Sequence, residues 1–396
     1  MLDESLLDSP EALGRADAHG LLRGAAEAGA HVRTAARQAA ESGLTELRPD
    51  GRPRSVLVAG PGPATACAAD LLGALSNGAV PVTLLRPAGS LAAPGALRWT
   101  LPGWAGPVDL LLVITPDGTE AGLTVLIEQA YRRGCTVVSV SPPTAPVATL
   151  TGETHGLAVP VATGPIVARD PYAPAQGGEG PAGQPSPRQG GPGAPGTLWA
   201  LLTPLLVLAD RLGLVPAGQQ VLQSLADRLD DVAERCGPVV ATYSNPGKTL
   251  ATELSGTLPL LWSEGAVAGA AARHCAVTFT ALPGLPALAA ELPEAMTEHG
   301  ALLAGALAAA ADPDDFFRDR VEDPEALRAR VVLLREHAPD GDSAVVAVRD
   351  LAYAQDTPLS ELEPAEGSTL LEAAAELIAT ADFAAVYLAL AGGDAS

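Results

Sequence analysis

The segment from residue 108 to residue 141, VDLLLVITPDGTEAGLTVLIEQAYRRGCTVVSVS, constrains the fold more than any other part of the chain. Val108 to Ile114 form an almost continuous apolar run, which is typical of a parallel strand covered on both faces. A polar turn follows, then a helical run to about Arg133, a stop at Gly134 and a second strand, CTVVSVS. The pattern therefore predicts a βαβ unit.

The polar turn of this unit is a candidate ligand site. It holds Thr115, Asp117, Gly118, Thr119 and Glu120 directly before the helix. The first N–H groups of a helix have no partner within the helix, and they commonly bind phosphate at the carboxyl end of a strand. We therefore expect a small anionic ligand at this turn.

Composition excludes several classes of protein. The chain has 396 residues, 47% of them hydrophobic, which is enough for two sizeable α/β cores. No 18-residue run is as free of polar and helix-breaking residues as a membrane span requires. The formal net charge of −22 argues against nucleic acid or an anionic membrane as a partner. The four cysteines are widely separated and the histidines have no partners at metal-ligand spacing, so we expect a reduced cytoplasmic protein without metal or cofactor.

Changes in composition divide the chain into four parts. Residues 1–50 predict amphipathic helices, and residues 51–169 predict a first α/β domain. Residues 170–196 are rich in Pro and Gly and predict a disordered insertion. Residues 197–396 predict a second α/β domain that ends in a helix from Ser368 to about Leu390.

Further elements follow from shorter apolar runs. In the first domain we predict strands over residues 54–60, 81–85 and 156–161, and in the second over Leu258–Trp262, Ala276–Phe279 and 345–350, with another in the Arg-lined run after residue 327. Four polar residues have structural interpretations. Asn245 caps a helix, Lys248 is a surface charge, and Arg273 and His274 end a helix before a strand.

Motifs in both halves resemble the sugar isomerase (SIS) domain family. VLVAGPGPATACAADLL is similar to the family's G-M-G-G-S-x-x-x-x-D start, and ITPDGTEAGLTVLIEQA stands where the family has S-Y-S-G-N-T-E-E. NPGKTLATELSGTLPLLW resembles the N-x-x-K-x-L-A-x-x-L-x-G-x-x-P stretch of bifunctional phosphoglucose/phosphomannose isomerases. DFAAVYLALAGGD resembles their terminal helix. The similarity runs in order over about 330 residues.

The resemblance implies a fold and a function. The fold is α/β, with two tandem SIS domains that are each a mainly parallel sheet sandwiched by helices. The protein is expected to be a homodimer, with ligand sites near the subunit interface. The implied activity is phosphosugar binding and aldose–ketose isomerisation of glucose 6-phosphate or mannose 6-phosphate to fructose 6-phosphate.

The phosphate-binding loops of the family are only partly matched. Gly60 and Gly62 stand in the first loop, where Pro63 and Ala64 replace a glycine and a serine. In the second loop an alignment without gaps places Ile114, Pro116 and Thr119 at the three hydroxyl positions. One deletion places Thr115, Asp117 and Thr119 there instead, beside Gly118. Thr119 occupies a hydroxyl position in both alignments, and Arg169 stands near the family's substrate-closing P-R pair.

The family's catalytic groups are not found in their usual places. Its base is the Glu of E-N-A-K, where this chain has FTALPGLP with Thr280 or a neighbour at the carboxylate position. Glu294 and His299 lie in ELPEAMTEHG, near the family's L-P-E-x-x-H-N, and are the candidate acid–base residues. Two hypotheses remain: an isomerase in which Glu294 and His299 are rearranged, or a catalytically degenerate protein that senses a sugar phosphate or scaffolds a partner.

Overall fold

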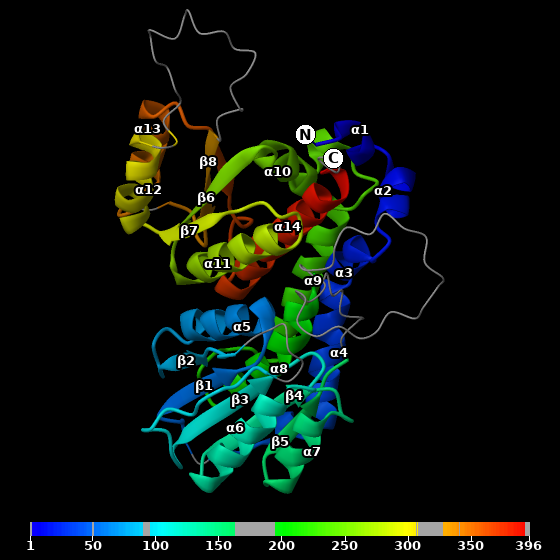
Figure 1. The fold of residues 1–396 in the computed structure, drawn as a ribbon, viewed down its shortest axis with the longest axis vertical. Coiled ribbons are helices and arrows are strands. Elements are labelled where there is room, and N and C mark those ends of the chain that lie inside the picture. Colours follow the sequence, from blue (N-terminus) through cyan, green and yellow to red (C-terminus); the bar gives the residue numbers. More distant parts are fainter. Residues whose placement is uncertain are drawn as a thin grey trace, which may run out of the picture. The chain divides into compact units, whose positions relative to one another are not determined.

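The computed structural model describes residues 2–49, 51–89, 96–162, 195–305, 307, 328–339 and 341–392. It divides into two compact units (Figure 1). The first unit is Arg23–Asp227, and the second combines Met1–Leu22 with Arg228–Ser396. The predicted disordered insertion and Arg169 lie outside the described residues, apart from the last two positions of the insertion.

The first unit contains a five-stranded parallel sheet in the order β2-β1-β3-β4-β5. Every residue of β3 is buried, as the apolar run predicts. The predicted βαβ unit is confirmed, with α6 joining β3 to β4. The strands are β1 (Ser55–Ala59), β2 (Val82–Leu85), β3 (Asp109–Ile114), β4 (Thr136–Ser141) and β5 (Leu157–Pro160).

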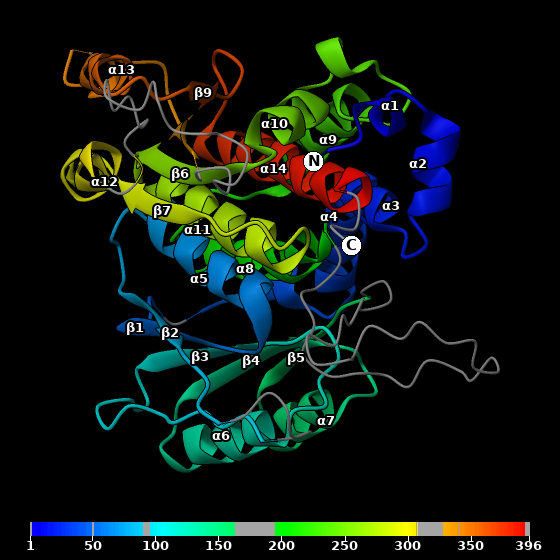
Figure 2. The same ribbon diagram turned by 45° about the horizontal axis from the view of Figure 1, so that its top comes forward.

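Helices cover both faces of this sheet (Figure 2). Helices α5 (Gly62–Leu75) and α8 (Thr197–Arg211) pack on one face, and α6 (Ala121–Arg132) and α7 (Pro146–Glu153) pack on the other. Helix α4 (Ala28–Glu41) lies against α8 and leads into the 3₁₀ turn η1 (Leu44–Glu46). Because α8 packs on the first sheet, the division between the units falls inside α9 (Gln219–Arg235), whereas the sequence placed it at residue 197.

The second unit contains a four-stranded parallel sheet in the order β7-β6-β8-β9. Helices α12 and α13 cover one face, and α10, α11 and α14 pack on the other side (Figure 1). The strands are β6 (Thr257–Glu264), β7 (Leu288–Glu291), β8 (Arg328–Arg335) and β9 (Leu359–Leu362). The helices are α10 (Pro246–Leu254), α11 (Ala266–Ala281), α12 (Glu294–Ala304), α13 (Val345–Ala354) and α14 (Leu370–Ala391), with the 3₁₀ turn η2 (Thr242–Ser244).

The N-terminal residues form short helices rather than one or two long ones. Helices α1 (Glu4–Leu7) and α2 (Pro10–Ala16) belong to the second unit, and α3 (Leu21–Ala26) crosses the division. Ser9 is the N-cap of α2 and Pro10 its first residue, although the Ser9 side chain makes no capping hydrogen bond.

Two predicted strands are helices. Residues 276–279 lie inside α11, where Ala271, Ala272, Cys275, Thr278 and Phe279 are buried at helical spacing. Residues 345–350 lie inside α13, which buries positions 345, 348 and 352. A short run of β-branched residues is compatible with a strand or a helix. Over a longer stretch the buried positions recur every three or four residues, which indicates a helix.

Helix α14 is the core helix of the second unit. Its N-terminus is a capping box in which Thr369 and Glu372 each accept a hydrogen bond from the other's backbone N–H group. It is long and apolar enough to span a membrane, so the expectation that no such run exists was wrong. However, 89% of its most apolar window is buried inside the protein. Its length and apolar character are explained by packing against α10 and α11.

Candidate functional site

The strand order of the first sheet reverses between β1 and β3. Strand β1 pairs with β2 on one side and β3 on the other, so the connections after β1 and β3 lead to opposite faces of the sheet. In open parallel sheets, ligands bind outside the carboxyl ends of the strands at such a reversal. The predicted glycine loop and polar turn both lie here.

The loop after β1 is pressed against the end of β3. A Cβ atom on Gly60 would lie 1.8 Å from the carbonyl oxygen of Ile114, so only glycine fits this position. Gly62 begins α5 with φ +80°, a conformation that glycine adopts without strain. The Thr65 hydroxyl, which is fully buried, donates to the Pro61 carbonyl oxygen at 2.9 Å. The fold thus places Gly60 against the end of β3, and Gly62 lies two residues further along the same loop.

The turn after β3 satisfies its own donors. The buried Thr115 hydroxyl accepts a hydrogen bond from Gly118 N–H at 3.0 Å and lies 3.1 Å from Asp117 Oδ1. Asp117 Oδ1 also accepts from Thr119 N–H at 3.2 Å. Gly118 has φ +67°, and a Cβ there would lie 2.4 Å from the Ala145 side chain. The Asp117 carboxylate therefore occupies the position of an anion at the turn.

This arrangement changes the roles predicted for the turn. Thr115 and Asp117 stabilise the turn, and the Thr119 N–H group is already bonded. The Thr119 side chain is exposed, and no hydrogen bond of its hydroxyl is recorded within the described part of the chain. Thr119 remains the hydroxyl best placed to meet a ligand, beside a carboxylate that repels anions.

Glu120 belongs to the predicted polar turn, but the sequence assigned it no role of its own. It is the N-cap of α6 and only 7% exposed. Burial, with a smaller effect of Asp117, raises the pKa of its carboxyl group. Within the described residues, its Oε2 and the hydroxyls of Ser139 and Ser141 on β4 have no hydrogen-bond partner. A polar residue before a helix reads as an ordinary cap in a sequence, because burial there depends on tertiary packing.

The strand order of the second sheet reverses between β6 and β8, and a carboxylate fills the helix start after β6. Glu336, just after β8, accepts hydrogen bonds from Val267 N–H at 2.7 Å and Ala268 N–H at 3.0 Å. These groups form the first turn of α11. Gly265 has φ +102°, and a Cβ there would collide with the Glu336 side chain. The start of α11 therefore holds an acidic side chain of the protein itself, and the turn before α6 holds another, Asp117.

The candidate acid–base residues lie on α12 and do not form a pair. Glu294 is exposed in the first turn of that helix. His299 is 7% exposed, and its Nδ1 accepts a hydrogen bond from Trp262 Nε1 at 2.8 Å. Burial lowers the pKa of His299. His299 is thus a neutral core residue, a geometry that does not support the catalytic role suggested by its sequence position.

Other predicted positions are corrected. Asn245 caps α10, as expected, because its side chain accepts from Lys248 N–H. Lys248 is fully buried rather than a surface charge. Arg273 and His274 lie in the middle of α11, where Arg273 pairs with Glu291 and His274 Nε2 lies 3.1 Å from Asp382. The Thr280 hydroxyl donates to the Ala276 carbonyl oxygen and is exposed.

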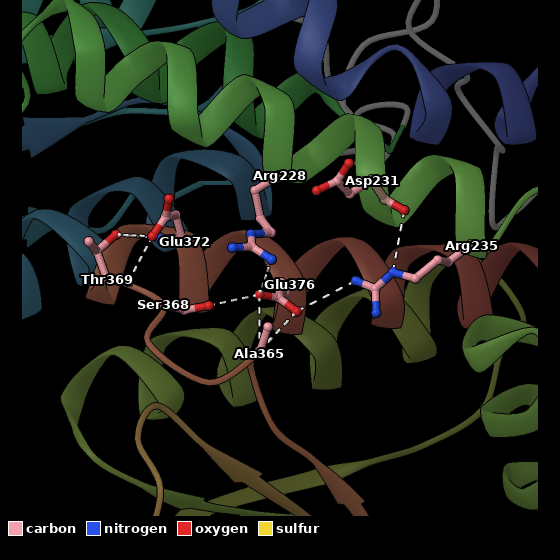
Figure 3. Close-up of polar contacts among 8 residues, drawn as sticks. All are labelled: Arg228, Asp231, Arg235, Ala365, Ser368, Thr369, Glu372 and Glu376. Carbon is pink, nitrogen blue, oxygen red and sulfur yellow. Dashed lines mark hydrogen bonds and ion pairs between the residues drawn. The ribbon is translucent and has the colours of Figure 1, made fainter.

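A separate polar cluster joins α9 to α14 (Figure 3). The Glu376 carboxylate lies 3.5 Å from both Arg228 and Arg235. It also accepts hydrogen bonds from Ala365 N–H and the Ser368 hydroxyl. Every oxygen of this carboxylate is engaged, so the cluster has a structural role. Among the residues with described positions, no group of three or more His, Cys, Asp or Glu side chains could hold a metal ion.

Comparison with known proteins identifies the fold. Residues 243–394 match the family model for the bacterial phospho-glucose isomerase C-terminal SIS domain. This match and the two parallel sheets flanked by helices support tandem SIS domains. A search of curated proteins found no significant match.

Solved structures are similar over nearly the whole chain. A candidate phosphosugar isomerase from Silicibacter pomeroyi DSS-3 is 14% identical with a TM-score of 0.57, covering 93% of this chain and 97% of that one. The C-terminal domain of glucosamine-fructose-6-phosphate aminotransferase from Francisella tularensis is 11% identical with a TM-score of 0.55, covering 95% and 97%. The tagatose-6-phosphate ketose/aldose isomerase of Escherichia coli is 14% identical with a TM-score of 0.51, covering 94% and 92%. At these identities the likeness shows the fold alone.

Proposed function

We propose that this chain is a catalytically degenerate SIS protein that acts by binding a ligand or a partner and does not isomerise phosphosugars. One observation carries the proposal: Glu336 accepts hydrogen bonds from the first N–H groups of α11, and Asp117 accepts one from Thr119 N–H in the turn just before α6. A carboxylate of the protein itself therefore lies at or beside each place where the fold would hold an anion. A phosphate could enter only if these carboxylates moved away or became protonated.

The charge at the turn disfavours a sugar phosphate. Two like charges 4 Å apart repel by about 1 kcal/mol in water and by about 4 kcal/mol near a protein surface. Asp117 is half-buried, so the repulsion on each phosphate charge falls between these limits. A neutral sugar would not meet this penalty. We infer that the turn after β3 favours neutral sugars over sugar phosphates.

The candidate acid–base groups for isomerisation are also not arranged for catalysis. Moving a proton between C1 and C2 needs an accessible base, and ring opening needs a second acid–base group. Glu294 is exposed on α12, while His299 is 7% exposed and its Nδ1 is occupied by Trp262 Nε1. The residues that the resemblance would assign to catalysis are therefore not arranged as a pair.

The test compares turnover and binding in one preparation. Purified protein is incubated with glucose 6-phosphate, mannose 6-phosphate and fructose 6-phosphate in deuterated water. NMR follows exchange of the C2 proton in the two aldoses and of a C1 proton in fructose 6-phosphate. The melting temperature is measured with the same compounds and with glucose, mannose and fructose. We expect no exchange, and larger shifts with the neutral sugars than with their phosphates.

Asp117→Asn provides the decisive variant. Asparagine keeps an oxygen for the Thr119 N–H group and removes the charge, so sugar phosphates should then shift the melting temperature more than in the wild type. Glu128→Gln, at an exposed position of α6, is the matched control and should not change the response. Equal phosphate responses in the wild type and Asp117→Asn would contradict the proposal.

A second candidate is a phosphosugar isomerase that uses Glu120 as the base. Its buried carboxyl group with a raised pKa is the kind of group that serves as a general base near neutral pH. This candidate predicts C2 exchange by the wild type that is lost in Glu120→Gln while Asp117→Asn keeps it. Exchange of this kind would replace the degenerate interpretation.

The homodimer implied by the resemblance and the cytoplasmic location remain proposals. Light scattering of the purified chain tests the first. A mass near twice 39.8 kDa is expected, and a monomer at micromolar concentration would remove it.

A further inference from the structure

A cavity of the first unit is lined by none of the residues of the loops after β1 and β3. It is bounded by α4, α8, the start of α9 and η1, and its volume is about 510 Å³. Cavities of about 300–1,000 Å³ hold most small-molecule ligands. Helices α4, α8 and α9 that form its walls are labelled in Figure 1.

The rim of this cavity is positively charged. Arg33 and Arg37 come from α4 and Arg211 from α8. The chain as a whole has 46 acidic residues against 24 basic ones, so three guanidinium groups at one cavity run against its general charge. A concentration of this kind attracts an anion locally, because charges beyond about 10 Å are screened at ordinary ionic strength.

The three arginines are not equally engaged. Arg33 pairs with Asp227 at 2.7 Å. Arg211 donates through Nε and Nη2 to the Leu47 carbonyl oxygen at 3.1 and 2.9 Å, which fixes its side chain and leaves further N–H donors. Arg37 is exposed, and no hydrogen bond or ion pair of its side chain is recorded among the residues with described positions. Arg211 is therefore preorganised and Arg37 is available.

The acidic groups near the cavity are already committed. Asp210 lines it and accepts a hydrogen bond from Ala217 N–H at 3.0 Å, and Asp227 is held by Arg33 and by Gln223 Nε2. Counting these two carboxylates against the three guanidiniums leaves one excess positive charge. The start of α9 at Gln219 has no acidic residue in its first turn, which adds a favourable dipole for an anion.

The floor of the cavity is apolar. Val32 and Ala36 come from α4, Val207 from α8 and Leu222 from α9. Val32, Val207 and Leu222 are at most 6% exposed. A simple inorganic anion would leave this surface without a partner, whereas a ligand with an apolar body would cover it.

We propose that this cavity binds an amphipathic anion, with its carboxylate or phosphate head at Arg37 and Arg211 and its apolar body against Val32, Val207 and Leu222. The proposal is independent of the sites at the turn after β3 and at the start of α11, because it uses none of their residues. It gives the first unit a second ligand site.

The experiment measures binding to the full chain by calorimetry and thermal shift. Octanoate and octyl phosphate are compared with octanol, which has the same tail without the charge, and with inorganic phosphate, which has the charge without the tail. We expect the two amphipathic anions to bind at least about tenfold more tightly than octanol, and to bind more weakly as salt is raised. Equal affinity for octanoate and octanol would overturn the proposal, as would inorganic phosphate binding as tightly as octyl phosphate.

Three variants locate the site. Arg37→Gln and Arg211→Gln should each weaken octanoate binding by about tenfold, which is the effect of losing roughly 1.4 kcal/mol of binding. Ala36→Leu fills the floor and should weaken octanoate and octanol alike. Arg132→Gln, at an exposed position of α6, is the control. Binding that is unchanged in both Arg37→Gln and Ala36→Leu, with each variant folded by circular dichroism, places the ligand elsewhere and overturns the proposal.

Discussion

Lys248 Nζ lies 5.6 Å from the centroid of the Tyr387 ring, and both side chains are completely buried. The ammonium donates to the carbonyl oxygens of Pro238 at 2.8 Å and Val240 at 2.7 Å. The Tyr387 hydroxyl in turn donates to the Cys236 carbonyl oxygen at 2.6 Å. The only lysine of the chain thus holds the segment before α10 against α14.

Replacing this lysine with a residue of similar shape should destabilise the second unit. Lys248→Met keeps the apolar stem but leaves the Pro238 and Val240 carbonyls without their donor. Removing the partner of a part-buried carbonyl costs up to about 1–3 kcal/mol, and two carbonyls lose their donor here. Urea denaturation measures the change, with Arg132→Met as an exposed control within about 0.5 kcal/mol of the wild type. A variant as stable as the wild type would contradict this account.

His299 should make stability depend on pH. Burial lowers its pKa in the folded protein below the unfolded value of about 6.5. Below pH 6.5 the unfolded chain therefore binds a proton that the folded protein resists, so the free energy of unfolding falls as the pH is lowered. His299→Gln keeps an acceptor for Trp262 Nε1 and removes this effect.

The measurement is urea unfolding at pH 7.5 and at pH 5.5. Between pH 7.5 and pH 5.5 the free energy of unfolding should fall more for the wild type than for His299→Gln. His19→Gln, at an exposed position, should show the same difference at both. A constant difference for His299→Gln would mean that His299 titrates normally.

Glu336 should be replaceable by an external anion. Glu336→Ala removes the acceptor for Val267 N–H and Ala268 N–H at the start of α11 and should cost about 2 kcal/mol. Phosphate or sulfate at millimolar concentration should then restore part of the lost melting temperature, because it can occupy the vacated helix start. Glu372→Ala removes a carboxylate from the start of α14 instead and is the matched control. Equal responses to phosphate in the two variants would disprove a hidden anion site.

The two ion pairs of Glu376 allow the effect of solvent exposure on ion-pair strength to be measured at a constant distance. Arg228 and Arg235 are both 3.5 Å from its carboxylate, but their side chains are 26% and 51% exposed. Water screens the second pair more strongly, so a double-mutant cycle should give a larger coupling energy for Glu376 with Arg228, of about 1 kcal/mol, than with Arg235. Glu376→Gln combined with Arg228→Gln or Arg235→Gln supplies the two cycles. Equal couplings would show that exposure has no influence here.

The sequence predicted the first βαβ unit because each of its signals is local. The apolar run of β3, the polar turn and Gly134 all act within a few residues of their own position. The run Ala276–Phe279 was misassigned because four residues cannot distinguish a strand from a turn of helix. Only the burial of Ala272 and Cys275 before it reveals the helical period.

The tertiary contacts of the candidate site residues could not be predicted in the same way. Glu336 is 69 residues from Val267, and no local pattern indicates that its carboxylate will close the start of α11. The pairing of Trp262 with His299 likewise joins β6 to α12 through tertiary packing. Asp117 is the exception, since its partner Thr119 is two residues away, and an Asp in a turn often bonds to a nearby N–H group.

The pairing of Leu2 with Gly392, together with the hydrogen bond from Asp3 N–H to the Ala391 carbonyl oxygen, has a consequence for the order of folding. The first unit is one continuous segment and can form while the chain is still being synthesised. The second unit needs both residues that precede the first unit and its core helix α14, which follows the first unit in the chain, so its earliest residues must wait for that helix. During that interval the apolar surfaces of α10 and α11 are unprotected, which makes the half-made chain a substrate for chaperones.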